Sequence, residues 1–362
     1  MQRALELARL AVGHTSPNPA VGAVIVNNGE IVAEGFTQPP GKPHAEAEAI
    51  RKAGDAARGG TIYVTLEPCN HFGRTPPCTL GIIEAGIKEV HYATPDPNPR
   101  AAGGHQRLLD AGVKVYTGQF ADEALEINRA FFHHTKTGRP YVIAKFASSL
   151  DGKIATHTGE SQWITGPAAR QMGHELRHQT DAILVGSGTA KADDPQLTTR
   201  LPADDTRTPS HPTRIVLDSK GTLASELKLV SSQLPGRTWI AVTDQISPAD
   251  RKRLTKPGVE IIEVAKTSDN KIDVNDLLKQ LGERDIQSLM VEGGAQVLGA
   301  FFSQKAIHEV WTFIAPKIIG GQAAPGPIGG QGFAKLQDAL ILNDMHFQAL
   351  GDDLFIRGKV NP

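Results

Sequence analysis

The chain has 362 residues, 40% of them hydrophobic and 21% charged, which is globular composition with enough apolar material for two cores. Lysine plus arginine (38) nearly balances aspartate plus glutamate (39), so the chain has neither a broad basic field for nucleic acid nor an acidic tail. No stretch approaches the ~20 apolar residues that span a bilayer, so we expect no membrane partner and a cytoplasmic location. The length and the balanced charge lead us to expect two domains and no nucleic acid partner.

The first part of the chain alternates predicted helices and strands. An amphipathic N-terminal helix precedes VGAVIV, the turn NNG and IVAEGF, which together predict a β-hairpin. PHAEAEAIRKAG predicts a helix that begins after proline and ends at glycine. The segments that follow are TIYVTLEP (strand), CTLGIIEAG (helix), EVHYAT (strand), GGHQRLLDAG (helix), VKVYTG (strand) and ALEINRAFFHHTKTGRP (closing helix and connector). The alternation predicts a sheet with helices on its faces, and a boundary near Gly138 to Pro140 gives domains 1–139 and 140–362.

The second part predicts another α/β domain. Its predicted strands are YVIAKFASSLDG, DAILVGS, TRIVLDS, TWIAVT, SLMVEGG and EVWTFIA. Helical stretches such as PAARQMGHELRHQ and DVNDLLKQLGE lie between them, and MHFQALGDDLFIRG predicts a final hairpin. There is no G-x-G-x-x-G, so the usual dinucleotide site is not indicated. Of two glycine turns, VGSGTAKADDP and VEGGAQVLGA, the second leads from strand to helix and could present N–H groups to a phosphate, although such turns more often bind nothing.

The chain's two cysteines, Cys69 and Cys78, flank one loop. They could form a disulfide or simply be buried, but one disulfide would do little for a chain of this size, and structural disulfides are rare in the cytosol. His44, at the start of the PHAEAEA helix, supplies a third candidate ligand. Three such ligands with a fourth position open are the arrangement of a catalytic zinc site.

Several neighbours of these ligands have predicted roles. Glu46 follows His44 by two residues and is placed to move a proton from a water to a leaving group. Glu48 is displaced around the same helix, so we expect it to be solvated. Cys78 should begin a helix, where the dipole favours its thiolate. His71, inside the loop, is a rival ligand for which a substrate-facing or surface role is expected.

H-x-E followed by P-C…C is the signature of zinc-dependent nucleobase deaminases, which usually carry P-C-x-x-C. Here eight residues separate the cysteines, and the long form P-C-x-H-x-G-R-T-P-P-C resembles the deaminase domain of the bifunctional riboflavin-biosynthesis deaminase/reductase. The resemblance extends to TSPNPAVGAVIV, GKPHAEAEAI and DPNP. It implies a cytidine-deaminase-like α/β domain that holds Zn²⁺ through His44, Cys69 and Cys78, with Glu46 as catalytic residue. It also implies that Asn18 contacts a phosphorylated pyrimidine, whereas by itself Asn18 could be only a turn residue.

The rest of the chain is similar to the reductase half of the same family, which resembles dihydrofolate reductase in fold. KFASSLDGKIA, GESQWIT, GTAKADDPQLTTR, VLDS and VEGG follow in that order. The contacts to NADPH that this implies are Ser148, Trp163, Thr189, Asp193, Ser219 and the segment from Gly294. The implied contacts to the ribosyl-phosphate substrate are Ser161, Arg177, Leu197, Arg200 and Glu292. The forked donors of the two arginines suit the phosphate.

Single residues of this second set keep simpler alternatives. Trp163 could be a core residue, Arg177 a solvated helix charge, and Lys145 a cap at a strand end. Reduction of an opened sugar needs a proton donor as well as a hydride, and Asp193, Glu292 and Lys145 are all candidates.

The resemblance implies an enzyme that deaminates a diaminopyrimidinone ribosylamino 5′-phosphate and then reduces its ribosyl side chain to ribityl. One rival is a deaminase for free nucleosides or bases fused to a folate-type reductase, and dephosphorylated substrate would separate the two. Another is a nucleic-acid-binding or regulatory module with structural zinc, which a fourth protein ligand such as His71 would favour. We expect a homo-oligomer, although the sequence does not give the number of subunits.

Overall fold

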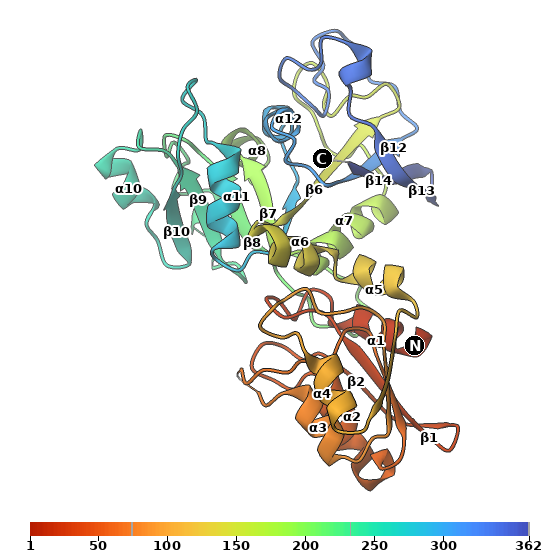
Figure 1. Ribbon diagram of the computed structural model, residues 1–362. Coiled ribbons are helices and arrows are strands. Elements are labelled where there is room, and N and C mark those ends of the chain that lie inside the picture. The colour runs from red at the N-terminus through yellow and green to blue at the C-terminus, as the bar shows by residue number, and fades with distance from the viewer. Residues whose placement is uncertain (74, 232, 361–362) are drawn as a thin grey trace. The chain divides into compact units, whose positions relative to one another are not determined.

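The computed structural model describes residues 1–73, 75–231 and 233–360. The chain divides into two compact units, Met1–Gly138 and Arg139–Pro362. Each unit is built on its own β-sheet and has its own apolar core (Figure 1). No helix among the described residues is long and apolar enough to cross a membrane.

The first unit contains a five-stranded sheet in the order β2-β1-β3-β4-β5. Its strands are β1 (Gly22–Asn27), β2 (Glu30–Phe36), β3 (Thr61–Val64), β4 (Glu89–Tyr92) and β5 (Lys114–Thr117). β1 pairs antiparallel with β2 and with β3, whereas β3, β4 and β5 are parallel. The predicted β1–β2 hairpin is therefore confirmed. The loops that follow β3 and β4 leave the sheet at the same edge, because the carboxyl ends of parallel strands lie together.

Helices cover both faces of this sheet. They are α1 (Gln2–Ala11), α2 (Ala45–Ala53), α3 (Cys78–Glu84), α4 (Gly104–Asp110), α5 (Ala121–Ile127) and α6 (Arg129–Thr137), with a 3₁₀ turn, η1 (Gly54–Ala57), after α2. α2, α3 and α4 share one apolar core with the sheet, and α1 packs on Val24 of β1 in a separate cluster. Glycine permits the close approach of α2, because a Cβ on Gly35 would lie 2.3 Å from the Ala45 carbonyl oxygen. The helix that carries His44 at its entrance is thereby fixed against β2.

The predicted closing helix is in fact two helices, α5 and α6, separated at Asn128. The Asn128 side chain is buried and hydrogen-bonds both backbone groups of Ala20, accepting from the N–H at 2.8 Å and donating to the carbonyl at 2.9 Å. The sequence gives no sign of this break, since the reason for it lies on a segment far away in the chain. The contact anchors the segment that carries Asn18.

The second unit contains a nine-stranded sheet in the order β10-β9-β8-β7-β11-β6-β12-β14-β13. Its strands are β6 (Tyr141–Ser149), β7 (Ala182–Gly186), β8 (Thr213–Leu217), β9 (Thr238–Val242), β10 (Val259–Glu263), β11 (Ser288–Val291), β12 (Glu309–Ala315), β13 (Leu342–Leu350) and β14 (Asp353–Val360). All pairings from β10 to β12 are parallel, and β14 and β13 add an antiparallel edge. The six predicted strands and the final hairpin are confirmed, and β10 is an addition to them.

The order of these parallel strands reverses at the centre of the sheet. After β6 the chain forms β7, which is two positions away in the sheet, and then adds β8, β9 and β10 outward from β7. It next returns to form β11 between β7 and β6, and then forms β12 on the other side of β6. Ligands of open α/β sheets bind at such a switch point, beyond the carboxyl ends of the strands. The helices of this unit are α7 (Pro167–Gln179), α8 (Ser187–Asp193), α9 (Lys228–Ser231), α10 (Pro248–Leu254), α11 (Val274–Gly282) and α12 (Ala295–Ser303), with the 3₁₀ turn η2 (Leu336–Asp338).

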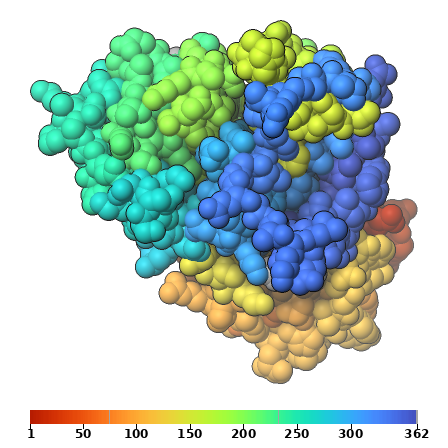
Figure 2. Space-filling model, turned by 90° about the horizontal axis from the view of Figure 1, so that it is seen from above, coloured from red at the N-terminus to blue at the C-terminus, as the bar shows by residue number. Residues whose placement is uncertain are grey.

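The segment after β6 lies against the segment after β12. The Ile154 N–H donates to the Pro325 carbonyl at 3.0 Å, and the Lys153 ammonium donates to the Ala324 carbonyl at 3.0 Å. Figure 2 shows these parts side by side, the first in yellow-green and the second in blue. Both segments leave the sheet at its carboxyl edge.

Candidate functional site

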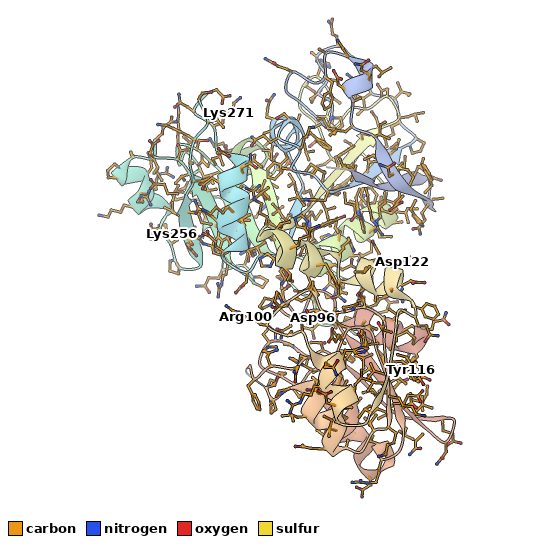
Figure 3. All side chains as sticks on the ribbon, viewed as in Figure 1. Asp96, Arg100, Tyr116, Asp122, Lys256 and Lys271 are labelled. Carbon is orange, nitrogen blue, oxygen red and sulfur yellow. The ribbon has the colours of Figure 1, made fainter. Side chains whose placement is uncertain are left out.

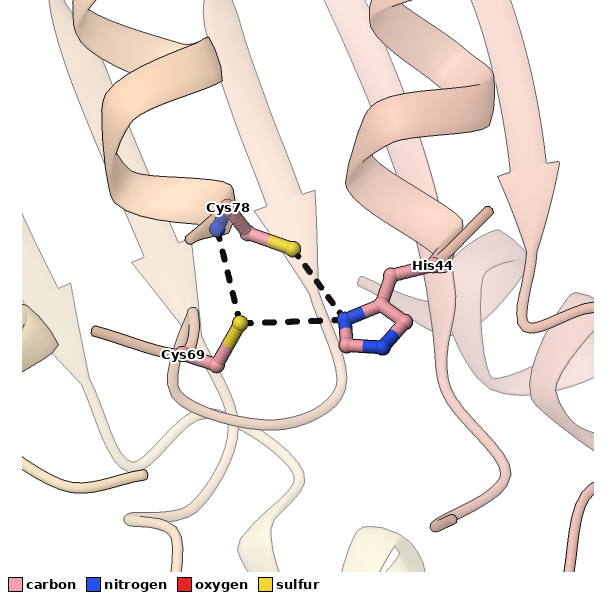
Figure 4. A group of neighbouring side chains, drawn as sticks. All are labelled: His44, Cys69 and Cys78. Carbon is pink, nitrogen blue, oxygen red and sulfur yellow. Dashed lines mark hydrogen bonds between the residues drawn. The ribbon is translucent and has the colours of Figure 1, made fainter. Parts of the chain in front are cut away.

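His44, Cys69 and Cys78 come together in the first unit (Figure 4). His44 is the N-cap of α2, Cys78 is the first residue of α3, and Cys69 lies in the loop between β3 and α3. Their ligand atoms all lie within 4.8 Å of one another. The His44 Nδ1 atom is 3.7 Å from the Cys69 Sγ and 3.4 Å from the Cys78 Sγ.

This cluster fits a zinc ion in its donor chemistry and in its spacing. Tetrahedral zinc with bonds of about 2.3 Å to sulfur and about 2.0 Å to nitrogen places those ligand atoms about 3.5 Å apart. The two S···N distances, 3.7 and 3.4 Å, lie on either side of that value. Among the described residues the group consists of these three, so His71 is not a fourth member. Three protein ligands match a catalytic site rather than a closed structural one.

The two thiols share one negative charge unequally. A hydrogen bond from the Cys78 thiol, joined by one from His44, lowers the pKa of Cys69 to about 4, while burial opposes the shift. The pKa of Cys78 is raised, first by its hydrogen bond to Cys69 and then by burial. The expected lowering at the start of α3 is thus found on Cys69, to which the Cys78 backbone N–H also donates at 3.4 Å. A divalent cation would end this competition, because it stabilises both thiolates.

Glu46 is buried beside the cluster, with 4% of its surface exposed. Burial raises the pKa of its carboxyl to about 7, and the negative charge on Cys69 acts in the same direction. Glu46 and Cys78 are hydrogen-bonded. A carboxyl group with a pKa near neutrality can both accept and release a proton during a reaction at neutral pH.

Glu48 differs from the expectation. Its side chain is 14% exposed, accepts a hydrogen bond from Gln38 Nε2 at 2.8 Å and forms an ion pair with Lys52 at 2.9 Å. It is therefore not a solvated charge. Because Gln38 belongs to the segment between β2 and α2, the contact ties that segment to the helix that carries Glu46.

A pocket of about 320 Å³ opens beside Glu46 and the cluster. Its lining includes Asn18 and His71, and His71 belongs to the loop between the cysteines. The His71 Nδ1 atom is buried and has no hydrogen-bond partner among the described residues. A ligand in the pocket could therefore bind this atom.

The loop after β4 forms another wall of this pocket, which the sequence did not predict. Asp96, labelled in Figure 3, and Asn98 belong to it. Glu67 accepts the backbone N–H of Asp96 at 3.4 Å and that of His105 at 2.9 Å, and so holds the loop in place. Burial raises the pKa of Asp96 to about 6. Glu67 lies in the motif TLEP, and Asp96 and Asn98 lie in DPNP. Both motifs were recognised in the sequence, but no function was predicted for these three residues.

In the second unit, the residues expected to bind NADPH lie at the carboxyl edge of the sheet. Ser148 is near the end of β6, Thr189 and Asp193 are on α8 after β7, Ser219 follows β8, and Gly294 is the N-cap of α12 after β11. Thr189 and Gly294 are neighbours, because a Cβ on Gly294 would lie 3.2 Å from the Thr189 Oγ1. Gly294 has a φ of +60°, which favours glycine and leaves its backbone open to close approach.

These residues fit a dinucleotide at the switch point. They lie on or after β6, β7, β8 and β11, which are the strands on either side of the point where the strand order reverses. Strand, Gly-Gly and helix follow one another at β11 and α12, which directs backbone N–H groups at the same edge. Trp163 is 62% exposed and stacks under Arg170, whose guanidinium carbon lies 4.7 Å from the ring centroid. The core alternative for Trp163 is therefore wrong.

The residues expected to bind the substrate form three groups. Glu292, directly after β11, accepts from the Lys145 ammonium at 2.7 Å and from the Arg177 guanidinium at 2.6 Å. Burial alone would raise the pKa of Glu292, but Arg177 and Lys145 overcome this and lower it to about 2. Arg177 is 14% exposed, so it is not a solvated helix charge, and Lys145 lies within β6 rather than at its end.

Leu197 and Arg200 lie together on the segment after α8. Leu197 is buried with a φ of +54°, and Arg200 is exposed beside His174 of α7. Ser161 forms the third group with Asp193. Burial raises the pKa of Asp193, and the hydrogen bond from Ser161 opposes this rise. The structure thus joins Ser161 of the substrate set to Asp193 of the cofactor set.

Comparison with known proteins follows the same division. Residues 1–94 match the cytidine and deoxycytidylate deaminase zinc-binding region, and residues 140–356 match the RibD C-terminal domain. The riboflavin biosynthesis protein RibD of Actinobacillus pleuropneumoniae is 43% identical over 358 residues, which are 98% of this chain and 93% of that protein. RibD of Escherichia coli is 41% identical over 365 residues, with 98% and 96% covered.

Solved structures agree over the whole chain. Acinetobacter baumannii RibD superposes with a TM-score of 0.89 at 36% identity, covering 100% of this chain and 98% of that one. A Thermotoga maritima protein gives 0.86 at 36% identity, with 100% and 97% covered. That protein is a diaminohydroxyphosphoribosylaminopyrimidine deaminase and 5-amino-6-(5-phosphoribosylamino)uracil reductase.

The fold and the metal cluster define a bifunctional enzyme, a zinc-dependent deaminase joined in one chain to an NADPH-dependent reductase. Sequence similarity over nearly the full length then places the chain within a family. It belongs to the RibD family of riboflavin biosynthesis, whose members carry out both the deamination and the reduction. The fold class, the pathway and the two cofactors expected from the sequence are confirmed.

Proposed function

We propose that the first unit deaminates 2,5-diamino-6-ribosylamino-4(3H)-pyrimidinone 5′-phosphate, and that the second unit reduces the deaminated product to 5-amino-6-ribitylamino-uracil 5′-phosphate. The observation that carries the first step is the pocket beside the cluster, into which Glu46, His44 and Cys69 all face. The Thermotoga maritima relative supports both substrates, since it is described by the same pair of activities.

His44, Cys69 and Cys78 are the residues that would hold zinc in the deamination step. When bound, zinc polarises a water molecule and so makes it a nucleophile at neutral pH. Glu46 accepts a proton from this water as its oxygen bonds to the ring carbon that bears the 2-amino group. Glu46 then delivers a proton to the amino nitrogen, the carbon–nitrogen bond breaks, and ammonia leaves. The burial of Glu46 suits this exchange, because its carboxyl keeps the proton away from bulk water.

Asn18 is placed to orient the pyrimidine in this pocket. Its segment is held by Asn128, whose side chain hydrogen-bonds both backbone groups of Ala20. An amide both donates and accepts, which matches the alternating donors and acceptors of a pyrimidine edge.

The residues that would hold NADPH are Ser148, Trp163, Thr189, Asp193, Ser219 and the turn at Gly294. When bound, NADPH would supply the hydride for the carbon of the opened sugar that is attached to the pyrimidine amine. The groups that would hold the substrate are Ser161, Arg177, Leu197, Arg200 and Glu292. Lys145 and Arg177 keep Glu292 ionised, so Glu292 accepts hydrogen bonds rather than donating a proton.

Lys145 is the proton donor that this arrangement supports best. It lies on β6, which pairs with β11 beside the point where the strand order reverses, and its Nζ is held 2.7 Å from Glu292 Oε1. Asp193 is the second candidate, because burial raises the pKa of its carboxyl, although a hydrogen bond from Ser161 opposes this rise. Lys145 would protonate the atom that receives the electron pair when the hydride adds to carbon.

Arg200→Ala is expected to raise the reductase KM by roughly 10- to 100-fold, since a charge-assisted pair with phosphate contributes about 1.5–3 kcal/mol. Steady-state reduction of the deaminated substrate measures this, while deamination and NADPH affinity should be unchanged. Arg284→Ala, an exposed arginine after α11, is a control that should change nothing. Wild type should bind dephosphorylated substrate poorly, and the variant should lose little more. Equal losses for both substrates would show that Arg200 does not bind the phosphate.

Two further expectations stay predictions. A reducing compartment such as the cytoplasm would keep Cys69 and Cys78, which are unpaired, available for zinc. A homo-oligomer is the second.

A further inference from the structure

Helix α7 holds the segment that ends at Arg200 with three side chains from one face. Gln171 Nε2 donates to the Arg200 carbonyl at 3.3 Å, and Arg177 Nη1 donates to the Thr198 carbonyl at 3.3 Å. His174 lies between them on the helix, because residues three apart share a face. Its ring contacts both the backbone and the guanidinium of Arg200.

The contacts between His174 and Arg200 cannot all be hydrogen bonds at the same time. The Arg200 backbone nitrogen lies 3.3 Å from His174 Nδ1, and the Arg200 Nε and Nη2 atoms lie 3.3 and 3.2 Å from His174 Nε2. Every one of these arginine atoms is a donor. A neutral imidazole has one accepting nitrogen, and its other nitrogen carries a hydrogen. Whichever ring nitrogen carries the hydrogen, that N–H group therefore points at an N–H group of Arg200, and no hydrogen bond can form there.

The surroundings keep this imidazole neutral. Burial lowers the pKa of His174 to about 4, and the positive charges of Arg177, Arg200 and Lys145 act in the same direction, with Glu292 opposing them. A proton added to the ring would remove its last acceptor and would place a further cation beside three others. The conflict of donors is therefore present throughout the neutral pH range.

An anion between His174 Nε2 and the Arg200 guanidinium would resolve the conflict. Nδ1 would then accept the Arg200 backbone N–H, which fixes the hydrogen on Nε2. The Nε2–H and the guanidinium N–H groups would both donate to oxygens of the anion, and each donor would have an acceptor. A phosphate group suits this arrangement because several of its oxygens accept hydrogen bonds.

We propose that His174 binds the phosphate of the reductase substrate directly, as a neutral Nε2–H donor beside Arg200, and positions Arg200 through Nδ1. The inference rests on the proposed role of Arg200 and adds a second contact to the same phosphate. It gives the reductase site a donor that distinguishes the phosphorylated substrate from its nucleoside form.

Two substitutions separate the roles of the two ring nitrogens. His174→Asn places an amide oxygen near the position of Nδ1 and so keeps an acceptor for the backbone, but it lacks the donor at Nε2. His174→Gln reaches the Nε2 position with an amide N–H and lacks the Nδ1 acceptor. With the full-length zinc-loaded enzyme, His174→Asn should raise the reductase KM for the phosphorylated substrate by roughly tenfold or more. His174→Gln should stay within about threefold of wild type, and neither should change the KM for dephosphorylated substrate or the rate of deamination.

Several results would overturn the inference. Equal effects of the two substitutions, a larger effect of His174→Gln, or equal losses on both substrates would show that His174 only supports the loop. If Arg200→Ala weakens binding of the phosphorylated substrate while His174→Asn does not, the inference fails and the proposed phosphate site survives. If neither variant has an effect, the phosphate site itself is misplaced.

A measurement on the wild type keeps the test valid if a variant does not fold. Ribose 5-phosphate added to protein with ¹⁵N-labelled histidine should shift the Nε2 signal of His174 and slow the exchange of its hydrogen with water, and ribose should do neither. The signal is assigned by its absence in His174→Gln, or in His174→Asn if that variant is the one that folds. An unchanged signal at saturating ribose 5-phosphate would contradict direct contact.

Discussion

Glu46→Gln is expected to retain zinc and to lose deamination by about 10²–10⁴-fold, the usual contribution of a general acid–base residue. Glutamine has the same shape as glutamate, and Glu46 is not one of the three metal ligands, so the substitution leaves the ligands in place. An amide cannot accept the proton of the attacking water. Metal analysis of the purified variant and a steady-state assay of ammonia release measure the two halves of this prediction.

The matched comparison is Cys69→Ala, which removes a ligand and should purify without zinc. Both variants should reduce already deaminated substrate at the wild-type rate, because the metal cluster and its pocket lie within the first unit. A loss of deamination smaller than ~10-fold in Glu46→Gln would contradict its role. Stoichiometric zinc in Cys69→Ala would contradict the ligand set.

Lys145→Met is expected to lower the rate of reduction by about 10²-fold or more, because the proton that accompanies the hydride loses its donor. The affinity for NADPH should be unchanged, since Lys145 lies within β6 and is bound to Glu292. Single-turnover oxidation of NADPH measures the chemical step, and fluorescence titration measures cofactor binding. Lys279→Met, at a lysine that is 66% exposed on α11, is the control for loss of a positive charge.

The variant Lys145→Arg distinguishes two roles of Lys145, namely proton donation to the substrate and ion pairing with Glu292. Arginine keeps the positive charge beside Glu292, but its guanidinium does not lose a proton under these conditions. We expect this variant to be nearly as slow as Lys145→Met. Reduction at the wild-type rate in Lys145→Arg would show that Lys145 only orients Glu292, and another residue would then have to supply the proton.

The zinc cluster could be predicted from the sequence because each of its members lies in a recognisable local pattern. His44 precedes an amphipathic helix, Cys78 follows two prolines at a helix start, and Cys69 directly follows the predicted strand TIYVTLEP. Local patterns fix these elements, and because β2 and β3 both run antiparallel to β1, the segments that follow them leave the sheet at the same edge. The order of the strands in the second unit could not be obtained in this way, since the return of the chain to β11 depends on packing across the whole sheet.

Features that depend on distant partners were missed or mistaken. The helical position of Glu48 predicts a solvated side chain, but the structure pairs it with Gln38, which lies on a separate segment. The break at Asn128 arises from its contact with Ala20. Cys69 rather than Cys78 has the lowered pKa, because the two thiols compete for one charge and the local helix terminus does not decide between them.

The assignment of residues in the second unit came from resemblance, and the structure adds the physical relations between them. Spacing in the sequence gives no reason to join Lys145, Arg177 and Glu292, which come from a strand, a helix and a turn. Their ion pairs explain why Glu292 is ionised and why it is not the proton donor. His174 had no motif to mark it, although its place three residues before Arg177 puts both side chains on one face of α7.

The most direct test of the two-step account is mass spectrometry of the products formed from the diaminopyrimidinone ribosylamino 5′-phosphate by the full chain, with and without NADPH. We predict that the deaminated, unreduced compound accumulates without NADPH, and that the deaminated ribityl compound replaces it when NADPH is present. Dephosphorylated substrate should give little of the reduced product. The account would be contradicted by a reduced product that still carries its 2-amino group. It would also be contradicted if deamination occurred only when NADPH is present.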